Sequence, residues 1–254
     1  CLQTYPRPSG EKFGNQDSRL FTMRSSDLVT WAPPELIRVK GESVAEEHMG
    51  RMIDPYLLQD KDEPGTWFCF FKQNGVSVSV STTGLRGPWE FVGSAESGEN
   101  VCCLVDRAQG EYVLFHSPAN GVGIKRSRDP RSGWSEDVAL LTLGQDRRAP
   151  ASPGQDTTGW AWPWSAGRLT AGFVLPLDDT TNGGGANTTA GIGLQSQGTG
   201  LLFFHASDYA EADERGGFDT FASVAVAWSD DPHWLQWHWG TGTHDYQQCD
   251  TGQK

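Results

Sequence analysis

Short runs of apolar residues, separated by turn-forming residues, recur along most of the chain. Some runs alternate polar and apolar positions, as in Val76–Val80, while others are almost continuously apolar, as in Trp67–Lys72. Alternation with a period of two is typical of half-buried strands, and short continuous runs bounded by Gly, Asn or Asp are typical of fully buried ones. No stretch of useful length shows the 3.6-residue period of an amphipathic helix. The pattern therefore predicts an all-β protein built from many short strands.

A turn signature repeats after four of these runs. In each case Ser is followed within two residues by Asp or Thr and a few residues later by Trp, with the turns beginning at Ser25, Ser81, Ser127 and Ser229. Ser and Asp side chains bind nearby backbone N–H groups, and we expect the Trp to anchor the next strand. The gap from Ser127 to Ser229 is about twice as long as the gaps before it, so it holds either two units or one unit with a long insertion.

Each turn closes a unit of short strands, which is typical of a β-propeller blade. Three strand-like runs precede the turn and one follows it, and four strands in roughly 45 to 50 residues match one blade. We therefore expect one propeller domain over 1–254, with blades at approximately 1–45, 46–95, 96–145 and 160–245. A β-sandwich is the alternative architecture, since it also contains many short strands.

Charge and hydropathy narrow the class of protein further. The 254 residues carry 20 Lys and Arg against 32 Asp and Glu, a formal net charge of −12, which argues against binding to nucleic acid. No apolar run approaches the roughly 18 residues of a membrane-spanning helix. We expect a soluble bacterial protein, either secreted, periplasmic or cytoplasmic, whose oligomeric state the sequence leaves open.

The chain has five cysteines, and three of them fall in strand-like runs. Cys69 lies in one apolar run, and the adjacent residues Cys102 and Cys103 lie in another. Successive side chains of a strand point to opposite faces, so we expect Cys102 and Cys103 to do so. Their spacing matches no common metal site, which predicts buried free thiols.

Two carboxylates stand at similar places in neighbouring units. Asp54 precedes Ser81, and Glu99 precedes Ser127, at offsets along the chain that are nearly equal. We expect both to begin the innermost strand of a blade, where side chains from several blades converge on one end of the propeller. A pair of carboxylates with different surroundings can break a glycosidic bond, with one acting as a proton donor and the other acting on water. The same offset from Ser25 falls before residue 1, so we expect the first blade to be truncated in this chain and a third carboxylate to lie upstream.

The residues around this pair resemble a known family of enzymes. Asp54-Pro-Tyr56 enters a hydrophobic strand, the aromatic strand Trp67–Phe71 follows, and a Glu begins the next blade. In this, residues 1–145 are similar to the five-bladed β-propeller glycoside hydrolases of family 43 and their relatives in families 32, 117 and 130. The resemblance implies a five-bladed propeller that hydrolyses glycosidic bonds with inversion of configuration.

The resemblance also implies roles for single residues. In family 43 an Asp on the first blade is the general base, an Asp on the second tunes a pKa and orients the substrate, and a Glu on the third is the general acid. By position, Asp54 takes the second role and Glu99 the third, while the base has no counterpart in this chain. Glu99 is followed by Asn100, where the family often has a small residue and Pro, and this leaves the subfamily and the linkage open.

Further residues are candidates for binding sugar. Amides, hydroxyls and imidazoles suit sugar hydroxyl groups, aromatic faces stack on sugar C–H surfaces, and guanidinium groups can bind a hydroxyl or a carboxylate. The candidates are Arg51, Gln73, Asn74, Asn100, His116, Asn120, Trp162, Trp164, Arg168 and His205. His116 and His205 are expected to end equivalent second strands, where each also fits a purely structural role. No cofactor is expected, although the acidic stretch 208–214 leaves a structural calcium ion open.

Three functions remain in view. The first is a glycosidase that acts on plant or algal oligosaccharides or polysaccharides. The second is a carbohydrate-binding or inactive propeller, which the missing base favours. The third is a phosphate-dependent glycoside phosphorylase, which would need a basic cluster near the site, for which Arg51 and Arg168 are the two candidates. The Ser-turns also resemble the Asp-boxes of sialidases, but the chain shows no sialidase arginine triad.

Overall fold

The computed structural model describes residues 2–4, 17–118, 121–141, 168–176, 200–207, 222–229, 231, 233–235 and 237–239. Over these residues the protein is all-β, as the hydrophobic pattern predicts: its strands form antiparallel sheets, and its helical content is one 3-10 turn, η1, at Glu46–His48. No helix in the described ranges is long and apolar enough to cross a membrane.

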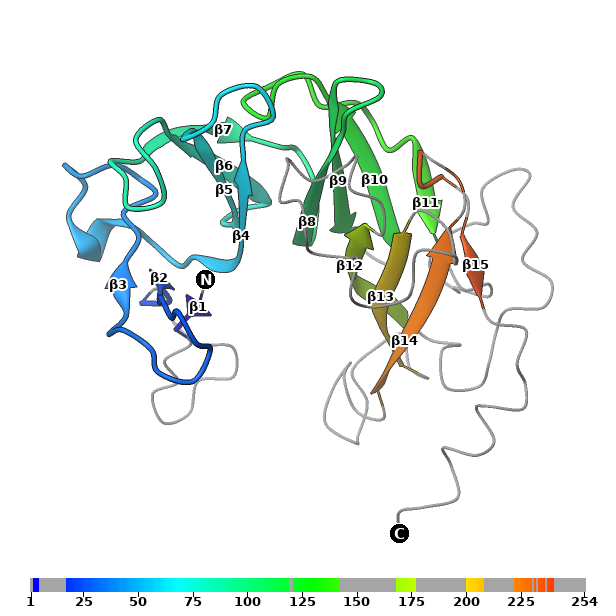
Figure 1. The fold of residues 1–254 in the computed structure, drawn as a ribbon, viewed down its shortest axis with the longest axis horizontal. Helices are drawn as coiled ribbons and strands as arrows, with labels where there is room; N and C mark the ends of the chain where they lie inside the picture. Colours follow the sequence, from blue (N-terminus) through cyan, green and yellow to red (C-terminus); the bar gives the residue numbers. More distant parts are fainter. Residues whose placement is uncertain are drawn as a thin grey trace, which may run out of the picture.

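The described strands form four consecutive sheets, and within each sheet the strands are paired in sequence order. The first sheet has three strands and the others have four. The strands are β1 (Leu2–Gln3), β2 (Leu20–Thr22) and β3 (Glu35–Leu36); β4 (Ile53–Gln59), β5 (Trp67–Lys72), β6 (Val76–Ser81) and β7 (Glu90–Ser94); β8 (Glu99–Asp106), β9 (Glu111–Ser117), β10 (Val122–Ser127) and β11 (Ala139–Leu141); β12 (Arg168–Pro176), β13 (Gly200–Ser207), β14 (Ala222–Ser229) and β15 (His238–Trp239). Figure 1 shows the sheets following one another in an arc, with β4, β8 and β12 toward its inside and β7, β11 and β15 toward its outside.

The predicted Ser-turns connect the last two strands of each sheet. In all four turns the serine hydroxyl accepts the backbone N–H of the residue two positions later, over 3.1 to 3.4 Å; the serines are Ser25, Ser81, Ser127 and Ser229. Aspartate side chains bind further N–H groups, as Asp27 does with the N–H groups of Val29 and Thr30. The local hydrogen bonding predicted from Ser and Asp is therefore confirmed, and it explains why the four units share this signature.

The tryptophans of these turns lie elsewhere than predicted. Trp89 and Trp234 are buried, but each lies in the turn before the last strand of its sheet. Trp31 is 48% exposed. Trp is therefore a buried apolar anchor in two of these turns, as expected, but the prediction that it lies on the next strand is wrong. The N–H of Trp234 donates to the Asp231 carbonyl within the turn, and its ring packs edge-to-face on Phe115.

The core lies between adjacent sheets, and alternate residues of a strand face alternate neighbours. On β5, Phe68 and Phe70 pack toward the third sheet, while Cys69 and Phe71 pack toward the first. On β8, Cys102 packs toward the fourth sheet and Cys103 toward the second, as predicted. Strands buried on both faces explain the continuous apolar run of β5. The prediction of buried free thiols is confirmed at all three described cysteines, Cys69, Cys102 and Cys103.

Candidate active site

The innermost strands β4, β8 and β12 each contain a bulge close to their start. The pairing with the next strand shifts between Ile53 and Tyr56, between Glu99 and Cys102, and between Thr170 and Phe173. One residue in each bulge has a positive φ: Asp54 at 54°, Asn100 at 56° and Ala171 at 53°. Non-glycine residues rarely adopt this conformation, and bulges often re-aim a side chain beside an active site. The three bulges therefore lie near the same end of the inner strands, and in each of them the regular pairing of the backbone is interrupted.

The bulges correct the predicted register of the two carboxylates. Asn100 occupies the bulge position that Asp54 occupies in β4, and Glu99 stands one residue earlier, opposite Ser117. The prediction that Asp54 and Glu99 are equivalent is therefore wrong by one residue. Asn100 also stands at the same offset from Ser127 that Asp54 has from Ser81. Because neighbouring residues of a strand point to opposite faces, this one-residue difference changes where each carboxylate points.

The structure nevertheless brings Asp54 and Glu99 together, through Lys72. Lys72 ends β5 opposite Ile53, and its ammonium group forms an ion pair with the Glu99 carboxylate across the two sheets. The charge of Lys72 also acts on Asp54, whose carboxylate accepts the backbone N–H of Asn100. The four residues Asp54, Lys72, Glu99 and Asn100 thus form one polar cluster between the second and third sheets.

Burial changes the proton affinity of Asp54. Removal of this carboxyl from water raises its pKa, and this effect exceeds the opposing effects of the Lys72 charge, the Asn100 N–H and the Arg51 charge. Asp54 and Glu99 both interact with Lys72, and a carboxyl group with a raised pKa in such a cluster is typical of sites of acid–base chemistry. It is Asp54, the residue to which the family resemblance gives a pKa-tuning role, that carries the raised value.

A second polar connection links the third sheet to the fourth. The Asn100 amide donates to the Ser117 hydroxyl over 3.3 Å, and the same hydroxyl accepts the N–H of Ala171 over 2.8 Å. On the other side of the cluster, the N–H of Asp54 donates to the side-chain oxygen of Gln3 on β1. Side chains of one sheet therefore bind the bulge of the next sheet at three successive junctions.

His116 braces the segment in front of Glu99. Its ring is buried; Nδ1 accepts the N–H of Gly98 over 2.9 Å, and Nε2 lies 2.7 Å from an Asp137 carboxylate oxygen. Burial lowers the pKa of His116 although Asp137 opposes the effect. Glycine is required on either side, since a Cβ at Gly98 would lie 1.8 Å from the Ser117 oxygen and one at Gly123 would lie 2.5 Å from His116 Nε2. Both ring nitrogens are thus engaged with the protein, and the ring acts on the position of Glu99.

His116 and His205 do not occupy equivalent positions, contrary to the prediction. His205 pairs with Thr170 at the edge of its bulge, as Lys72 pairs with Ile53, whereas His116 lies opposite the bulge itself. Both pairs of strands carry an equivalent bulge. The apolar run of β13 continues through Phe204 opposite that bulge, whereas the run of β9 ends at Phe115 and leaves His116 opposite it, so the ends of the two runs are one residue out of register.

The other predicted binding residues fall into two groups. Gln73 donates its amide to the carbonyls of Met49 and Arg51, over 2.8 and 3.3 Å, and so fixes the chain that carries Arg51. Asn74, with a φ of 56°, forms the exposed β5–β6 turn with Gly75. Asn120, Trp162, Trp164 and the acidic stretch 208–214 lie outside the described residues, and so does the side chain of Arg168, whose backbone begins β12.

The side chains of Gln3, Lys72, Ser117 and Asp137 contribute to this region but were not among the predicted site residues. Lys72, Ser117 and Asp137 supply the ion pair, the hydroxyl link and the histidine partner described above. Lys72 and Ser117 both end second strands directly opposite the start of a bulge, so aligning the units by their strand ends would have found them. Asp137 lies between β10 and β11, and no repeat signal marks it.

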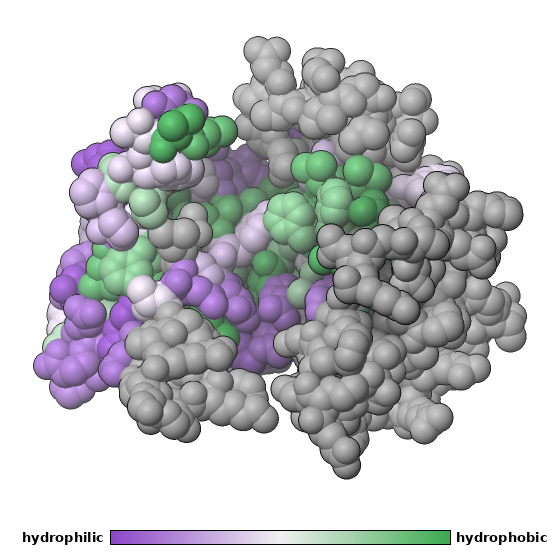
Figure 2. All heavy atoms as spheres, turned by 90° about the horizontal axis from the view of Figure 1, so that it is seen from below, coloured by the Kyte–Doolittle hydropathy of each residue, from purple (hydrophilic) through white to green (hydrophobic). Residues whose placement is uncertain are grey.

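The side of the molecule that is seen from below has a mixed surface (Figure 2). Figure 2, which views the molecule from below, shows hydrophilic residues over much of the described surface and hydrophobic atoms exposed toward its middle. Beside the polar cluster lies a hollow of about 500 Å³ lined by Lys40, His48, Met49, Gly50, Arg51, Lys72, Gln73 and Asn74. The hollow and the cluster share Lys72, so a bound molecule could contact both.

Comparison with known proteins gives likenesses only among solved structures. No protein-family model matches the chain, and no curated protein matches it. The similar structures include a "putative glycosidase" from Bacteroides thetaiotaomicron (15% identity, TM-score 0.49), the GH43B protein of a xyloglucan PUL from Bacteroides ovatus (12%, 0.45) and a GH43 protein from Bacillus licheniformis (12%, 0.43). They cover 86%, 90% and 92% of this chain, which spans 62%, 38% and 38% of theirs. At these identities and TM-scores the similar structures support no conclusion about activity. Evidence for an activity therefore comes from the residues of this chain.

Proposed function

We propose that this chain is the catalytic β-propeller of a glycoside hydrolase, and that its sheets are blades of a five-bladed propeller. Support for the architecture comes from four consecutive antiparallel sheets in an arc, with β4, β8 and β12 lining its inner side (Figure 1). A meander that begins on the inside and ends on the outside is the strand order of a propeller blade.

The observation that carries the catalytic proposal is the meeting of Asp54 and Glu99 around Lys72. Two carboxylates from adjacent inner strands, one with a raised pKa, converge at the bulged ends of β4 and β8. In the proposed reaction Glu99 protonates the leaving glycosidic oxygen, while Asp54 tunes the proton affinity of the cluster and orients the sugar. The reaction also requires a carboxylate that activates water, which the family resemblance assigns to the blade before Asp54.

Lys72 sets a condition on this mechanism. A carboxylate in an ion pair is held in its charged form, and a general acid must carry a proton before it can donate one. Glu99 therefore becomes a proton donor when the substrate draws Lys72 away from it. The substrate class that we propose is a plant or algal oligosaccharide or polysaccharide.

A carbohydrate-binding or inactive propeller is the second candidate, and one contact favours it. Asp54 accepts the N–H of Asn100 and so joins two sheets, as Gln3 and Ser117 do at the neighbouring junctions. Gln3 and Ser117 have no charge to contribute to catalysis. In this second function Asp54 is a structural link of the same kind and the protein binds sugar without cleaving it.

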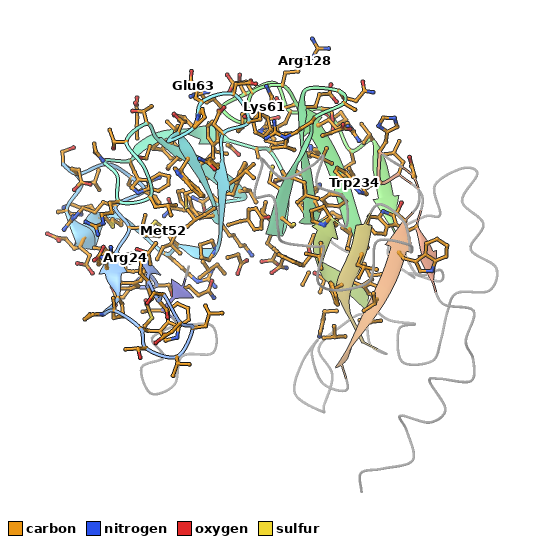
Figure 3. The ribbon with its side chains drawn as sticks, in the orientation of Figure 1. Arg24, Met52, Lys61, Glu63, Arg128 and Trp234 are labelled. Atoms are coloured by element: carbon orange, nitrogen blue, oxygen red, sulfur yellow. The ribbon has the colours of Figure 1, made fainter. Side chains whose placement is uncertain are left out.

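Replacement of Glu99 distinguishes the two candidates. The full-length protein that contains this chain is assayed on a panel of aryl furanosides and pyranosides, as wild type, as Glu99→Gln and as the control Glu63→Gln. Glu63 lies beyond the far end of β4, away from Met52, which precedes that strand (Figure 3). Loss of the general acid is expected to lower turnover by about 10² to 10⁴-fold, with Glu63→Gln unchanged. Equal turnover in Glu99→Gln and wild type contradicts the catalytic role of Glu99, and sugar binding without product release supports the second candidate.

A further inference from the structure

The hollow beside Lys72 concentrates positive charge in a chain that is acidic overall. Lys40, Arg51 and Lys72 line it together with His48, and none of its eight lining residues is an Asp or Glu. The whole chain carries a formal charge of −12. A concave surface lined by charges of one sign focuses its potential on a small volume and attracts the opposite charge. The hollow therefore suits an anion better than a neutral group.

The backbone that carries these cations is held in place. Gly50 has a φ of 74°, and a Cβ there would lie 2.7 Å from the Gln73 amide nitrogen that binds the carbonyls on either side. This contact fixes the turn that places Arg51 just before the start of β4. The segment of Lys40 is fixed as well, because the Ser79 hydroxyl donates to the Val39 carbonyl over 2.6 Å.

Lys40 is placed at some energetic cost. Its ammonium group lies 4.0 Å from the centre of the Phe91 ring, and burial lowers its pKa. A cation kept partly out of water over an aromatic face is stabilised further when an anion binds beside it. The arrangement of Lys40 and Arg51 therefore favours an occupant that carries negative charge.

We propose that this hollow binds an anionic oxygen group, and that the group is carried by an acidic sugar of the substrate, such as the carboxylate of a uronate. The identity of the sugar as part of a cleaved substrate rests on the proposed glycosidase function, whereas binding of the anion does not. The chemistry that recognises it is charge-assisted hydrogen bonding from Lys40, Arg51 and Lys72. Free inorganic phosphate presents the same chemistry from another source.

Lys72 couples this hollow to the catalytic pair. It lines the hollow and also forms the ion pair with Glu99. An anion in the hollow competes with Glu99 for the same ammonium group, and a Glu99 that loses its partner binds a proton more readily. Occupancy of the hollow thus favours the protonated Glu99 that the proposed reaction requires.

The first experiment tests the anion alone. Inorganic sulfate is titrated into the full-length protein, and backbone amide shifts of residues 40–51 and 72–75 are followed by NMR, for wild type, Lys40→Gln, Arg51→Gln and the control Lys61→Gln. Lys61 is a matched control, because its ammonium group also lies over an aromatic ring, that of Tyr112 at 5.5 Å, but at the opposite end of β4 (Figure 3). We expect saturable binding in wild type and Lys61→Gln, and affinity about tenfold or more lower in Lys40→Gln and in Arg51→Gln. Absence of saturable shifts in wild type, or equal affinity in all four proteins, overturns the proposal.

The second experiment identifies the source of the anion. Turnover is measured on aryl uronides and on the matching neutral aryl glycosides, with and without inorganic phosphate. Preference for uronides that Lys40→Gln reduces about tenfold or more supports the acidic sugar. Turnover of neutral glycosides that depends on phosphate overturns it in favour of free phosphate and phosphorolysis. If sulfate binds as expected and no glycoside is cleaved, the glycosidase function fails while the anion site stands.

Discussion

The carboxylate of Asp54 accepts the backbone N–H of Asn100, and this contact joins the bulge of β4 to the bulge of β8. The N–H of Asp54 is bound in turn by Gln3, and that of Ala171 by Ser117. At each junction a side chain of one sheet binds the N–H group that the next bulge removes from its ladder. Unpaired N–H groups are costly when buried, so these side chains stabilise the junctions between sheets. Asp54 differs from Gln3 and Ser117 by its charge, which lies beside Lys72.

The pH dependence of stability should reveal the charge of Asp54. Burial raises its folded pKa above the unfolded value, so its contribution to stability is complete below the unfolded pKa and is lost as the pH rises through the folded pKa. Asp54→Asn keeps an oxygen acceptor for the Asn100 N–H and removes the charge. We expect Asp54→Asn to become increasingly more stable than wild type as the pH rises above about 4, with the free energy of unfolding measured by urea unfolding at each pH. Asp62→Asn, an exposed control, should follow wild type; parallel curves for Asp54→Asn and wild type would contradict the raised pKa.

Two cations lower the pKa of Asp54, and they should differ in effect. Lys72 has the larger influence and Arg51 the smaller one. Lys72→Met is therefore expected to raise the pKa of Asp54 further, and Arg51→Met to raise it less. NMR titration of the Asp54 carboxyl carbon in the full-length protein measures both. Equal shifts in the two variants, or a larger shift in Arg51→Met, would contradict a cluster in which Lys72 acts on Asp54 more strongly than Arg51 does.

Gly98 should tolerate no side chain. A Cβ would lie 1.8 Å from the Ser117 carbonyl oxygen, which is backbone and cannot turn away. Overpacking costs up to about 3 kcal/mol where side chains can shift, so Gly98→Ala, whose clash is with backbone, should lower the free energy of unfolding by at least about 3 kcal/mol and move Glu99. Gly110→Ala is the control: its positive φ costs about 1 to 2 kcal/mol, but nothing lies within 4 Å of the added Cβ. A Gly98→Ala protein as stable as Gly110→Ala contradicts the close approach of the two strands.

The sequence predicted the sheets well because their signals are local. Each serine hydroxyl binds a backbone N–H two residues away, and alternation of apolar residues within a strand decides which neighbour it packs against. These interactions depend on residues within a few positions of one another, so the repeat appears in the sequence. The identical offsets of Asp54 and Asn100 from their Ser-turns were also present in the sequence.

The site was predicted less well because it depends on bulges and on contacts between sheets. All three inner strands carry an equivalent bulge, in which Asn100 and not the neighbouring carboxylate Glu99 matches Asp54. The apolar runs before His116 and His205 end at different positions relative to that bulge. The hollow joins Lys40, which lies between β3 and β4, to Lys72 at the end of β5, and no spacing within one repeat relates those positions. Contacts between sheets can therefore be identified only when the packing of the sheets is known.

The brace formed by His116 should make the fold sensitive to mild acid. Nδ1 accepts the Gly98 N–H and Nε2 binds Asp137, so the neutral ring donates to Asp137 and accepts from Gly98. Burial lowers the folded pKa of His116, and the nearby charge of Lys125 lowers it further, while Asp137 acts in the opposite sense. The stability that His116 contributes is therefore present above the unfolded pKa of about 6.5 and is lost as the pH falls through the lower folded value.

His116→Phe removes both hydrogen bonds and leaves the Gly98 N–H and Asp137 without this partner. We expect a loss of about 1 to 3 kcal/mol in the free energy of unfolding at about pH 7.5, and a smaller further loss than wild type on going to about pH 5. Urea unfolding at both pH values measures the two effects, with His48→Gln on η1 as an exposed histidine control. If the stability of wild type falls no more than that of His116→Phe between these pH values, protonation of His116 does not weaken the contacts that hold the segment in front of Glu99.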